Sequence, residues 1–377
     1  NYGRLTMRPT FLAFHTASRA LAASQANMDV TGNNIANVNT KGYTRQRVDL
    51  SSISSGGYTQ KYAVPTADVG LGVDVSRISQ IRDPFLDARY RDQASENGKF
   101  ETILAGLTDL ENIFDEISTE GLLHEISKFV NSLQSLAQTP SAGDIAQVVR
   151  TAAQKVTQIM NVYAKQINQV RSQQVFDLSQ VVINNDFNTK IKNIADLNAQ
   201  IRQEQTYGNV PNELLDKRNL LIDELAELAN IKVTSHPEKI SEDLTVERLT
   251  ISLYDPATGA SIGLVDGELY NTLHVKDDGE RISIQIATSF GPHGGADITN
   301  HFTGGSIKGY IDLINGHGIN EFRGVPYYRN SMDILASNFA RVLNELNTID
   351  PGNPKPLFSS ADGGPITAEN IRISQQW

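Results

Sequence analysis

The side chains that could carry out catalysis are scattered along this sequence. Its seven histidines belong to no zinc-protease, nucleophile-elbow or phosphate-loop motif. The chain has no cysteine, which removes disulfides, thiolate metal sites and cysteine nucleophiles together. The sequence therefore predicts no enzyme, no metal site and no cofactor.

Three polar segments are the remaining candidates for a small-ligand site. Gly291–Asp297 has a ligand-loop composition, but no strand-to-helix signal flanks it, so we expect an ordinary loop. Asp277–Glu280 lacks the alternating oxygen ligands of a calcium loop, so we expect a hairpin turn. A solvated helix face, rather than a catalytic carboxylate pair, is expected for the four acids Asp109, Glu111, Asp115 and Glu116.

Charge and hydropathy argue against two classes of partner. The 377 residues carry 33 Lys+Arg and 43 Asp+Glu, a net charge of −10, which argues against nucleic acid and weakly against anionic membranes. No apolar run reaches membrane-spanning length, and the first residues do not resemble a secretory signal. We expect Met7 to be the natural start and Asn1–Thr6 to be an addition.

Long helices dominate the predicted architecture over residues 84–230. Pro84 follows Asp83 as a helix start, and Asp144–Tyr207 runs for 64 residues without proline or glycine. At about 1.5 Å per residue this stretch would form a rod of roughly 95 Å, typical of coiled coils and fibres. Its apolar residues recur at heptad spacing, as in Ile145, Val149, Ala152, Val156, and again in Ile183, Phe187, Ile191, Ile194.

Short strands interrupt the helices twice. Period-two alternation predicts strands within 43–80 and an antiparallel set over 231–300, punctuated by Asp-Gly turns. Helices return at 305–315 and 326–347, the latter with one face made of Met332, Leu335, Phe339, Val342 and Leu346.

The predicted fold class is α+β, an elongated multi-domain molecule with a long antiparallel helical bundle or coiled coil and a small antiparallel β-domain. The expected divisions are an N-terminal axial helix (7–42), a long-helix bundle with short strands at 43–80 (43–234), a β-domain (235–303) and helices that return to the bundle, followed by a loop or strand (304–377).

The N-terminal helix carries the clearest packing signal. Phe14, Leu21, Met28 and Ile35 recur every seven residues, with a second row of small or weakly polar residues three positions later. This stripe is too thin to stabilise an isolated helix, so it needs a partner helix. We expect residues 9–40 to be poorly packed in a monomer or to pair with another chain.

An asparagine-rich turn follows that helix. Four asparagines fall within seven positions: Asn33, Asn34, Asn37 and Asn39. They are followed by Gly42 and by Tyr43 and Arg45, whose side chains could contact a neighbouring subunit. Helix capping explains one or two of these asparagines. We interpret the others as groups that could cross-link the backbones of neighbouring subunits.

The segment Asn33–Tyr43, with its N-N-I-A-N-x-N-T-x-G-Y pattern, resembles the N-terminal signature of bacterial flagellar axial proteins, the rod, hook and hook-associated family. Three further segments are similar to hook-associated members: Tyr43–Gln46, Pro211–Leu225 and Gly304–Asp312 with the Pro326-Tyr327-Tyr328 that follows. The hook subunit and a second junction protein stay open as alternatives within the family. A secreted enzyme or carbohydrate-binding module over 231–300 is the alternative of a different class.

The resemblance implies a non-enzymatic adaptor between hook and filament that assembles as a ring. Its implied partners are the hook protein, the second hook-associated protein and an export chaperone, and its implied location is extracellular, after unfolded type III export without a cleaved signal peptide. Members of the family end in a second heptad helix that pairs with the first. Since this sequence stops at Trp377 without one, we expect a shortened chain.

Overall fold

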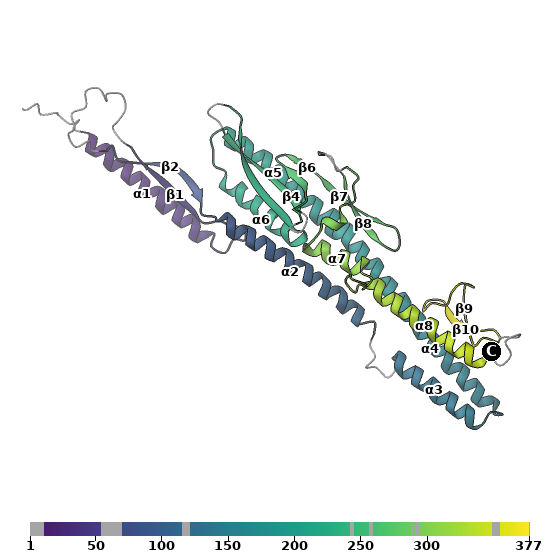
Figure 1. The fold of residues 1–377 in the computed structure, drawn as a ribbon. Helices are drawn as coiled ribbons and strands as arrows, with labels where there is room; N and C mark the ends of the chain where they lie inside the picture. Colours follow the sequence, from purple (N-terminus) through teal and green to yellow (C-terminus); the bar gives the residue numbers. More distant parts are fainter. Residues whose placement is uncertain are drawn as a thin grey trace, which may run out of the picture.

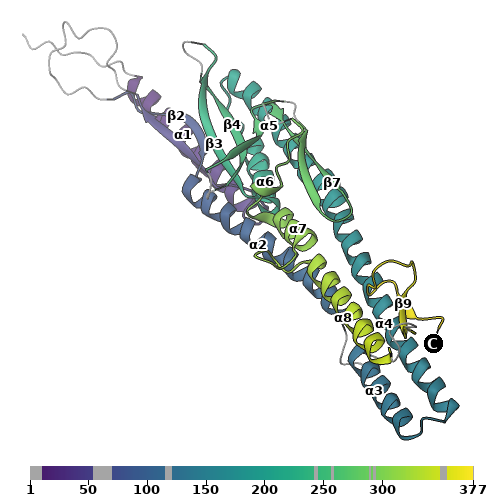
Figure 2. The ribbon, with the colours of Figure 1, turned by 45° about the vertical axis from the view of Figure 1, so that its right-hand side comes forward.

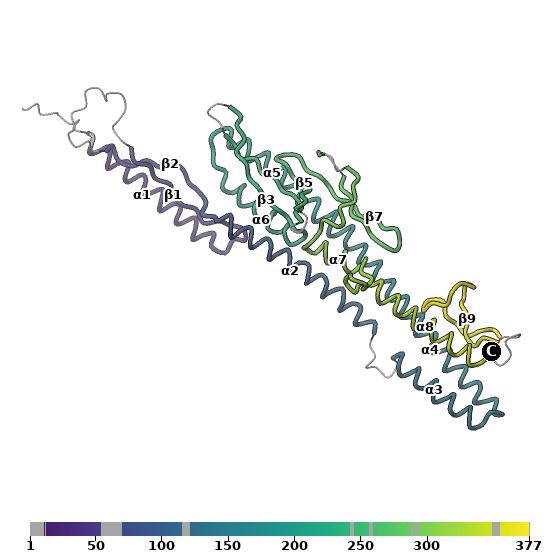
Figure 3. Tube along the Cα trace, in the orientation of Figure 1, coloured from purple at the N-terminus to yellow at the C-terminus, as the bar shows by residue number. Residues whose placement is uncertain are grey.

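A computed structural model describes residues 11–53, 70–114, 121–241, 245–255, 259–287, 290–291, 294–348 and 355–376. The molecule is a rod (Figure 1), and the path of its chain is easiest to follow in Figure 3. The N-terminal helix lies at one end, and the turn between α3 and α4 lies at the other. The expected elongated α+β fold is confirmed.

The N-terminal end is one helix on a two-stranded hairpin. Helix α1 (Leu12–Ala36) lies along β1 (Gln46–Ser52) and β2 (Val73–Gln80), which pair antiparallel with a bulge after Asp49. We call residues 11–53 and 70–80 the N-terminal module. The expected helix and strands are therefore present, whereas Asn1–Thr6 and Met7 lie outside the described residues.

The 64-residue helix exists, but its middle departs from α-helical hydrogen bonding. Helix α4 (Gly143–Phe176) continues without a break into a π-helical segment η1 (Asp177–Phe187) and then α5 (Asn188–Thr206). Such i→i+5 segments are rare and usually one turn long, and the heptad pattern did not predict this one. Gly208, at φ +84°, follows the end of the helix, as expected.

The distal half of the rod is a helical bundle with its own core. It contains α2 (Pro84–Glu111), α3 (Leu122–Gln138), α4, α8 (Val325–Asn347) and the small hairpin β9 (Phe358–Ser360) with β10 (Ile371–Ile373). Asp83 caps α2 as expected, because its Oδ1 accepts the backbone N–H of Phe85 at 2.9 Å. Of the four acids expected on a solvated face, Asp115 and Glu116 lie outside the described residues.

The strands of the proximal half share one core with the helices. Sheet β3 (Ile231–Lys239), β4 (Thr245–Tyr254), β5 (Ser261–Asp266), β6 (Leu269–Tyr270) and hairpin β7 (Thr272–Asp277) with β8 (Ile282–Ala287) are antiparallel. They pack on η1, α5, α6 (Asn212–Leu228) and α7 (Gly305–Asn315). The short 3₁₀ turn η2 (Thr299–His301) precedes α7 in the chain. The expected boundary at residue 235 therefore falls inside a strand and inside a continuous core.

Of the two polar loops considered in the sequence, one forms the expected turn and the other is only partly described. Asp277–Glu280 forms a turn in which Gly279 has φ +93° and Asp277 Oδ1 accepts its N–H. In the loop Gly291–Asp297, residues 292 and 293 lie outside the described part.

The predicted face of α8 is wrong in part. Met332, Ala336 and Ala340 are buried, whereas Leu335, Val342 and Leu346 are 41–76% exposed. The buried residues are spaced four apart, so the contact face of α8 differs from the predicted stripe with 3-4 heptad spacing. Two of the three are alanines, whose small side chains allow close packing against neighbouring helices.

Candidate assembly surface

Helix α1 carries two heptad rows on opposite sides. The inner row, Thr16, Ala23 and Val30, faces the β1–β2 hairpin, and Ala23 and Val30 are buried there. The outer row consists of Phe14, Leu21, Met28 and Ile35, and each of these side chains is 66–71% exposed. The inner row holds the helix on the hairpin, so the outer row is left uncovered by the part of the chain that the structure describes.

Asn34 joins the end of α1 to the start of β1. Its Nδ2 donates to the Gln46 carbonyl at 2.9 Å, and its Oδ1 accepts the Gln46 backbone N–H at 2.9 Å. The Tyr43 hydroxyl donates to the same Oδ1 at 2.9 Å. Burial raises the pKa of the Tyr43 phenol, and the nearby Asp216 charge adds to the shift. The amide of Asn34 thus bonds to both backbone groups of Gln46, as a neighbouring strand would.

The other asparagines of the turn divide into inward and outward groups. Asn37 Nδ2 donates to the Asn33 carbonyl at 3.0 Å and to Asn33 Oδ1 at 2.8 Å, and Thr40 donates to Asn37 Oδ1 at 3.2 Å. Asn33, Asn34 and Asn37 thus make hydrogen bonds within the chain, and the intersubunit role proposed for some of these asparagines stays a prediction. Asn39 and Arg45 are exposed and stay predicted interface residues.

Gly42 brings the turn against helix α6. It adopts φ +82°, and a Cβ at this position would lie 3.1 Å from the Leu220 side chain. Beside it, Lys41 Nζ contacts Glu224 Oε1 at 3.1 Å, and this hydrogen bond raises the pKa of the lysine. The left-handed conformation and the close approach explain why glycine occupies this position.

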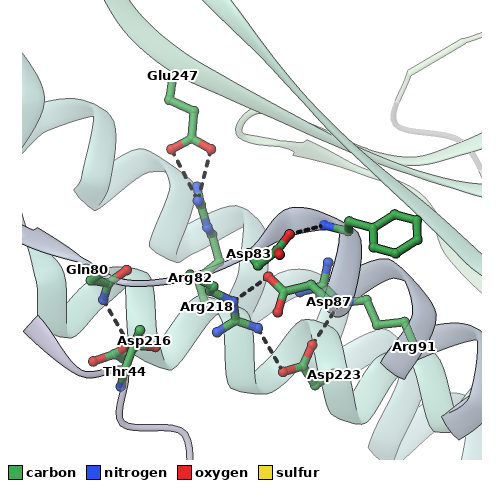
Figure 4. Close-up of polar contacts among 11 residues, drawn as sticks. Thr44, Gln80, Arg82, Asp83, Asp87, Arg91, Asp216, Arg218, Asp223 and Glu247 are labelled. Atoms are coloured by element: carbon green, nitrogen blue, oxygen red, sulfur yellow. Dashed lines mark hydrogen bonds and ion pairs between the residues drawn. The ribbon is translucent and has the colours of Figure 1, made fainter.

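One face of α6 holds the N-terminal module through hydrogen bonds (Figure 4). Asp216 Oδ1 accepts the Thr44 backbone N–H at 3.2 Å and the Gln80 amide at 2.8 Å. One turn earlier, Asn212 receives Gln80 on its carbonyl and donates to the Ile78 carbonyl at 3.1 Å. The start of β1 and the end of β2, which pair with each other, are therefore both tied to the same helix, at a contact we call the α6 joint.

The charges around the α6 joint are partly buried and paired. Arg82 contacts Asp87 and Asp223, and Arg91 Nε donates to Asp223 Oδ1 at 2.7 Å (Figure 4). Burial raises the pKa of the Asp216 carboxyl above its usual range, although the hydrogen bonds from Thr44 and Gln80 oppose the shift. Two residues after Asp216, Arg218 is almost fully buried and reaches Glu247 of β4 at 3.2 Å.

The sequence does not predict the α6 joint as a candidate site, although it contains both of the segments that form it. Asn33–Tyr43 and Pro211–Leu225 were singled out as separate motifs, and the structure places them in contact across a cavity of about 300 Å³. No periodicity relates two segments about 170 residues apart, so only the fold could join them.

The described residues hold no group of three or more acidic or histidine side chains arranged to bind a metal ion. Among the helices that the structure describes, none has the length and apolar character needed to cross a bilayer. The described fold and the exposed outer row define an elongated α+β protein with an uncovered helical surface at one end.

Comparison with known proteins identifies the family. Residues 107–350 match the model of the flagellar hook-associated protein FlgK helical domain, and residues 14–44 match that of the flagella basal body rod protein. Flagellar hook-associated protein 1 of Bacillus subtilis is 31% identical over 90% of this chain and 68% of its own length. The chain belongs to the FlgK family of flagellar hook-associated proteins.

More distant relatives agree with this assignment. Flagellar hook-associated protein 1 of Salmonella typhimurium is 28% identical over 58% of this chain, which spans 38% of that protein. The flagellar hook junction protein FlgK from Burkholderia pseudomallei has the same fold, with a TM-score of 0.55 and 21% identity over 72% of this chain and 46% of the other. The chain is thus a structural component of the flagellum.

Proposed function

We propose that this chain is a non-enzymatic adaptor at the hook–filament junction, and that it assembles through the outer row of α1. The observation that carries the proposal is the row itself: four large apolar side chains remain about two-thirds exposed while the opposite side of the same helix is packed. Monomeric proteins rarely leave such a row uncovered, and contiguous apolar surface usually marks an interaction site.

The energetics favour assembly over a solution dimer. Covering these four side chains contributes on the order of 5 kcal/mol at about 1.5–3 kcal/mol for each complete burial. Association itself costs roughly 4–15 kcal/mol, which is of the same size, so this row alone gives two free subunits little net stability. A ring whose subunits each contact several neighbours overcomes that cost, which fits an axial component.

The partners follow from the family. The proposed neighbours are the hook protein on one side, the second hook-associated protein on the other and further copies in the ring, with an export chaperone before assembly. The proposed location is extracellular, after type III export in an unfolded state. A chain without cysteine suits that route, because no disulfide can form before or after export.

Leu21→Glu in the full-length gene tests the surface. We expect the variant to be exported at normal levels but to lose filament attachment in a strain that lacks the native gene, because a carboxylate would be buried in the assembled row. The readout is filament count by electron microscopy, with secreted protein measured by immunoblot. Ala22→Glu is the matched control, since Ala22 is exposed on the same turn but lies off the row.

Normal filament attachment by the Leu21→Glu strain would refute the role of this row. Equal loss in both variants would point instead to a general intolerance of α1 to acidic residues. Loss of secreted protein in either strain would be a folding or export defect, which a Leu21→Met variant should not share.

A further inference from the structure

Strand β3 is an open edge of the four-stranded sheet. The strand order is β3-β4-β5-β6, so among the described strands β3 is paired on one side only. The Tyr254 N–H donates to the Asn230 carbonyl at 3.3 Å, and the register continues from Ile231–Leu253 without a shift. Since hydrogen-bonded and non-bonded pairs alternate in antiparallel strands, Lys232 and Thr234 point their backbone groups at β4.

The same alternation leaves Ile231, Val233 and Ser235 with backbone N–H and C=O groups directed away from β4. Pro237 supports this assignment independently, because it occupies the next outward position, where a missing N–H removes no ladder bond. Proline also closes the far end of the edge to pairing. The open part is therefore the short stretch Ile231–Ser235.

That stretch forms one wall of a groove, and helix α2 forms the other. The cavity has a volume of about 430 Å³, within the size range of ligand sites. Both faces of β3 contribute to it, through Ile231, Val233 and Ser235 on one side and Lys232 on the other. Because residues from both faces of β3 line the cavity, the groove runs along the edge of the strand. Figure 2 shows β3 on the side of the sheet nearest α2.

The opposite wall combines apolar surface with one available charge. It is built from the first two turns of α2, including Pro84 and Ala88. Asp87 and Arg91 are occupied by the ion pairs of the α6 joint. Asp92 is exposed and has no ion-pair partner within the described residues. On the strand side, Lys232 Nζ lies 4.5 Å above the Tyr254 ring and is thereby engaged.

We propose that an extended segment of a partner polypeptide adds to the sheet along Ile231–Ser235, between β3 and α2. Strand addition uses main-chain hydrogen bonds for affinity and alternate side chains for selectivity. The segment would pair with the outward groups of residues 231, 233 and 235, place an aliphatic side chain against Ala88 and Val233, and direct a lysine or arginine at Asp92. This surface is separate from the outer row of α1.

The test is a selection of phage-displayed random 12-residue peptides on the intact chain, followed by fluorescence anisotropy with the best synthetic peptide. Val233→Pro deletes one outward N–H without touching the β4 ladder, so we expect binding to weaken about tenfold or more. Val233→Thr keeps the N–H and a similar side-chain volume, so it should bind as the parent does. Asp92→Asn should reduce binding of peptides that carry a basic residue.

A second readout does not depend on any variant folding. In an added strand only alternate peptide N–H groups face β3, so N-methylation of one alternate set should abolish binding while methylation of the other set leaves it intact. Equal effects of the two methylated sets, equal binding to Val233→Pro, or no peptide enriched over an uncoated surface would each overturn the proposal.

Discussion

Two buried acidic side chains, Glu125 and Asp216, have pKa values shifted in opposite directions, so their contributions to stability should change oppositely in acid. Glu125 on α3 is 2% exposed and its Oε1 accepts Lys128 at 2.8 Å and Lys155 at 3.1 Å. These contacts, led by the hydrogen bond from Lys128, lower the pKa of Glu125 below its usual range. At the α6 joint, burial instead raises the pKa of Asp216. Acidification should therefore weaken the α3–α4 end of the rod before it weakens the joint.

Glu125→Gln tests the first of these sites. A lowered folded pKa contributes stability that is complete above the unfolded value of about 4.3 and is lost as the pH falls through the folded value. We expect the variant to lose about 1–2 kcal/mol of local stability at pH 7 and less at pH 3, because part of the charge-dependent contribution is lost as the pH falls. The measurement is amide hydrogen exchange of α3 and α4 at both pH values.

Glu345→Gln is the control for this prediction, because Glu345 pairs with Arg341 on an exposed helix surface and such pairs contribute little. A Glu125→Gln deficit that persisted unchanged at pH 3 would show that the carboxylate charge is not the source of the stability.

At the residue scale, local signals were predictable and long-range polar partners were not. The Asp83 cap and the helix end near Gly208 follow from backbone rules that act within a few residues. The use of Asn34 to bind Gln46 depends on a chain reversal that its neighbours only partly specify. Composition alone therefore suggested intersubunit asparagine links, and it did not predict that three of the four side chains, Asn33, Asn34 and Asn37, make hydrogen bonds within the chain.

At the scale of elements, one helix unites two separate cores. Within α4–η1–α5 the distal core includes Ile167 and the proximal core begins at Leu178. Between them the buried side chains are polar: Arg171, which reaches Asp277 at 2.8 Å, and Gln174. The π segment starts three residues later. Heptad spacing predicted the helix and both apolar faces, but it could not predict this polar layer or the changed hydrogen bonding.

Gln174→Leu should stabilise the rod. Gln174 is 4% exposed, and neither its amide nitrogen nor its amide oxygen has a partner within the described residues. Replacing an unsatisfied buried amide with an aliphatic side chain of similar size removes a desolvation penalty of about 1–3 kcal/mol. Urea unfolding followed by circular dichroism measures the gain, with the exposed neighbour variant Gln173→Leu as control.

A loss of stability in Gln174→Leu, with Gln173→Leu unchanged, would contradict this view. It would mean that water or a rearranged side chain satisfies the amide, and that the polar layer is a hydrated part of the fold.

At the scale of the whole molecule, the α6 joint sets the direction of α1 relative to the rod. The two sequence motifs that resemble the flagellar axial family meet there, with Asp216 between Thr44 and Gln80. An assembly surface on a helix is useful only if that helix is held at a defined angle. The sequence predicted the surface on α1, whereas its orientation depends on contacts between segments far apart in the chain.

Asp216→Ala should release the N-terminal module without unfolding the body. The variant removes the acceptor for Thr44 and Gln80, so we expect faster hydrogen exchange at the Thr44 amide and across β1 and β2, and more rapid proteolysis between residues 36 and 46. The amides of α4, α5 and β4 should exchange as in the parent, because their core does not include Asp216.

Asp216→Asn separates hydrogen bonding from charge in the same position. Its Oδ1 can still accept both donors, and burial already disfavours the charged carboxylate, so the asparagine variant should keep the joint closed at pH 7. Because the folded pKa of Asp216 is raised, the contribution of its protonated form is complete below the unfolded pKa and is lost as the pH rises through the folded value. The parent joint should therefore hold at least as firmly at pH 4 as at pH 7. Opening of the parent joint on acidification, or of the asparagine variant at pH 7, would show that the negative charge of Asp216, rather than its acceptor oxygen, positions α1 for assembly.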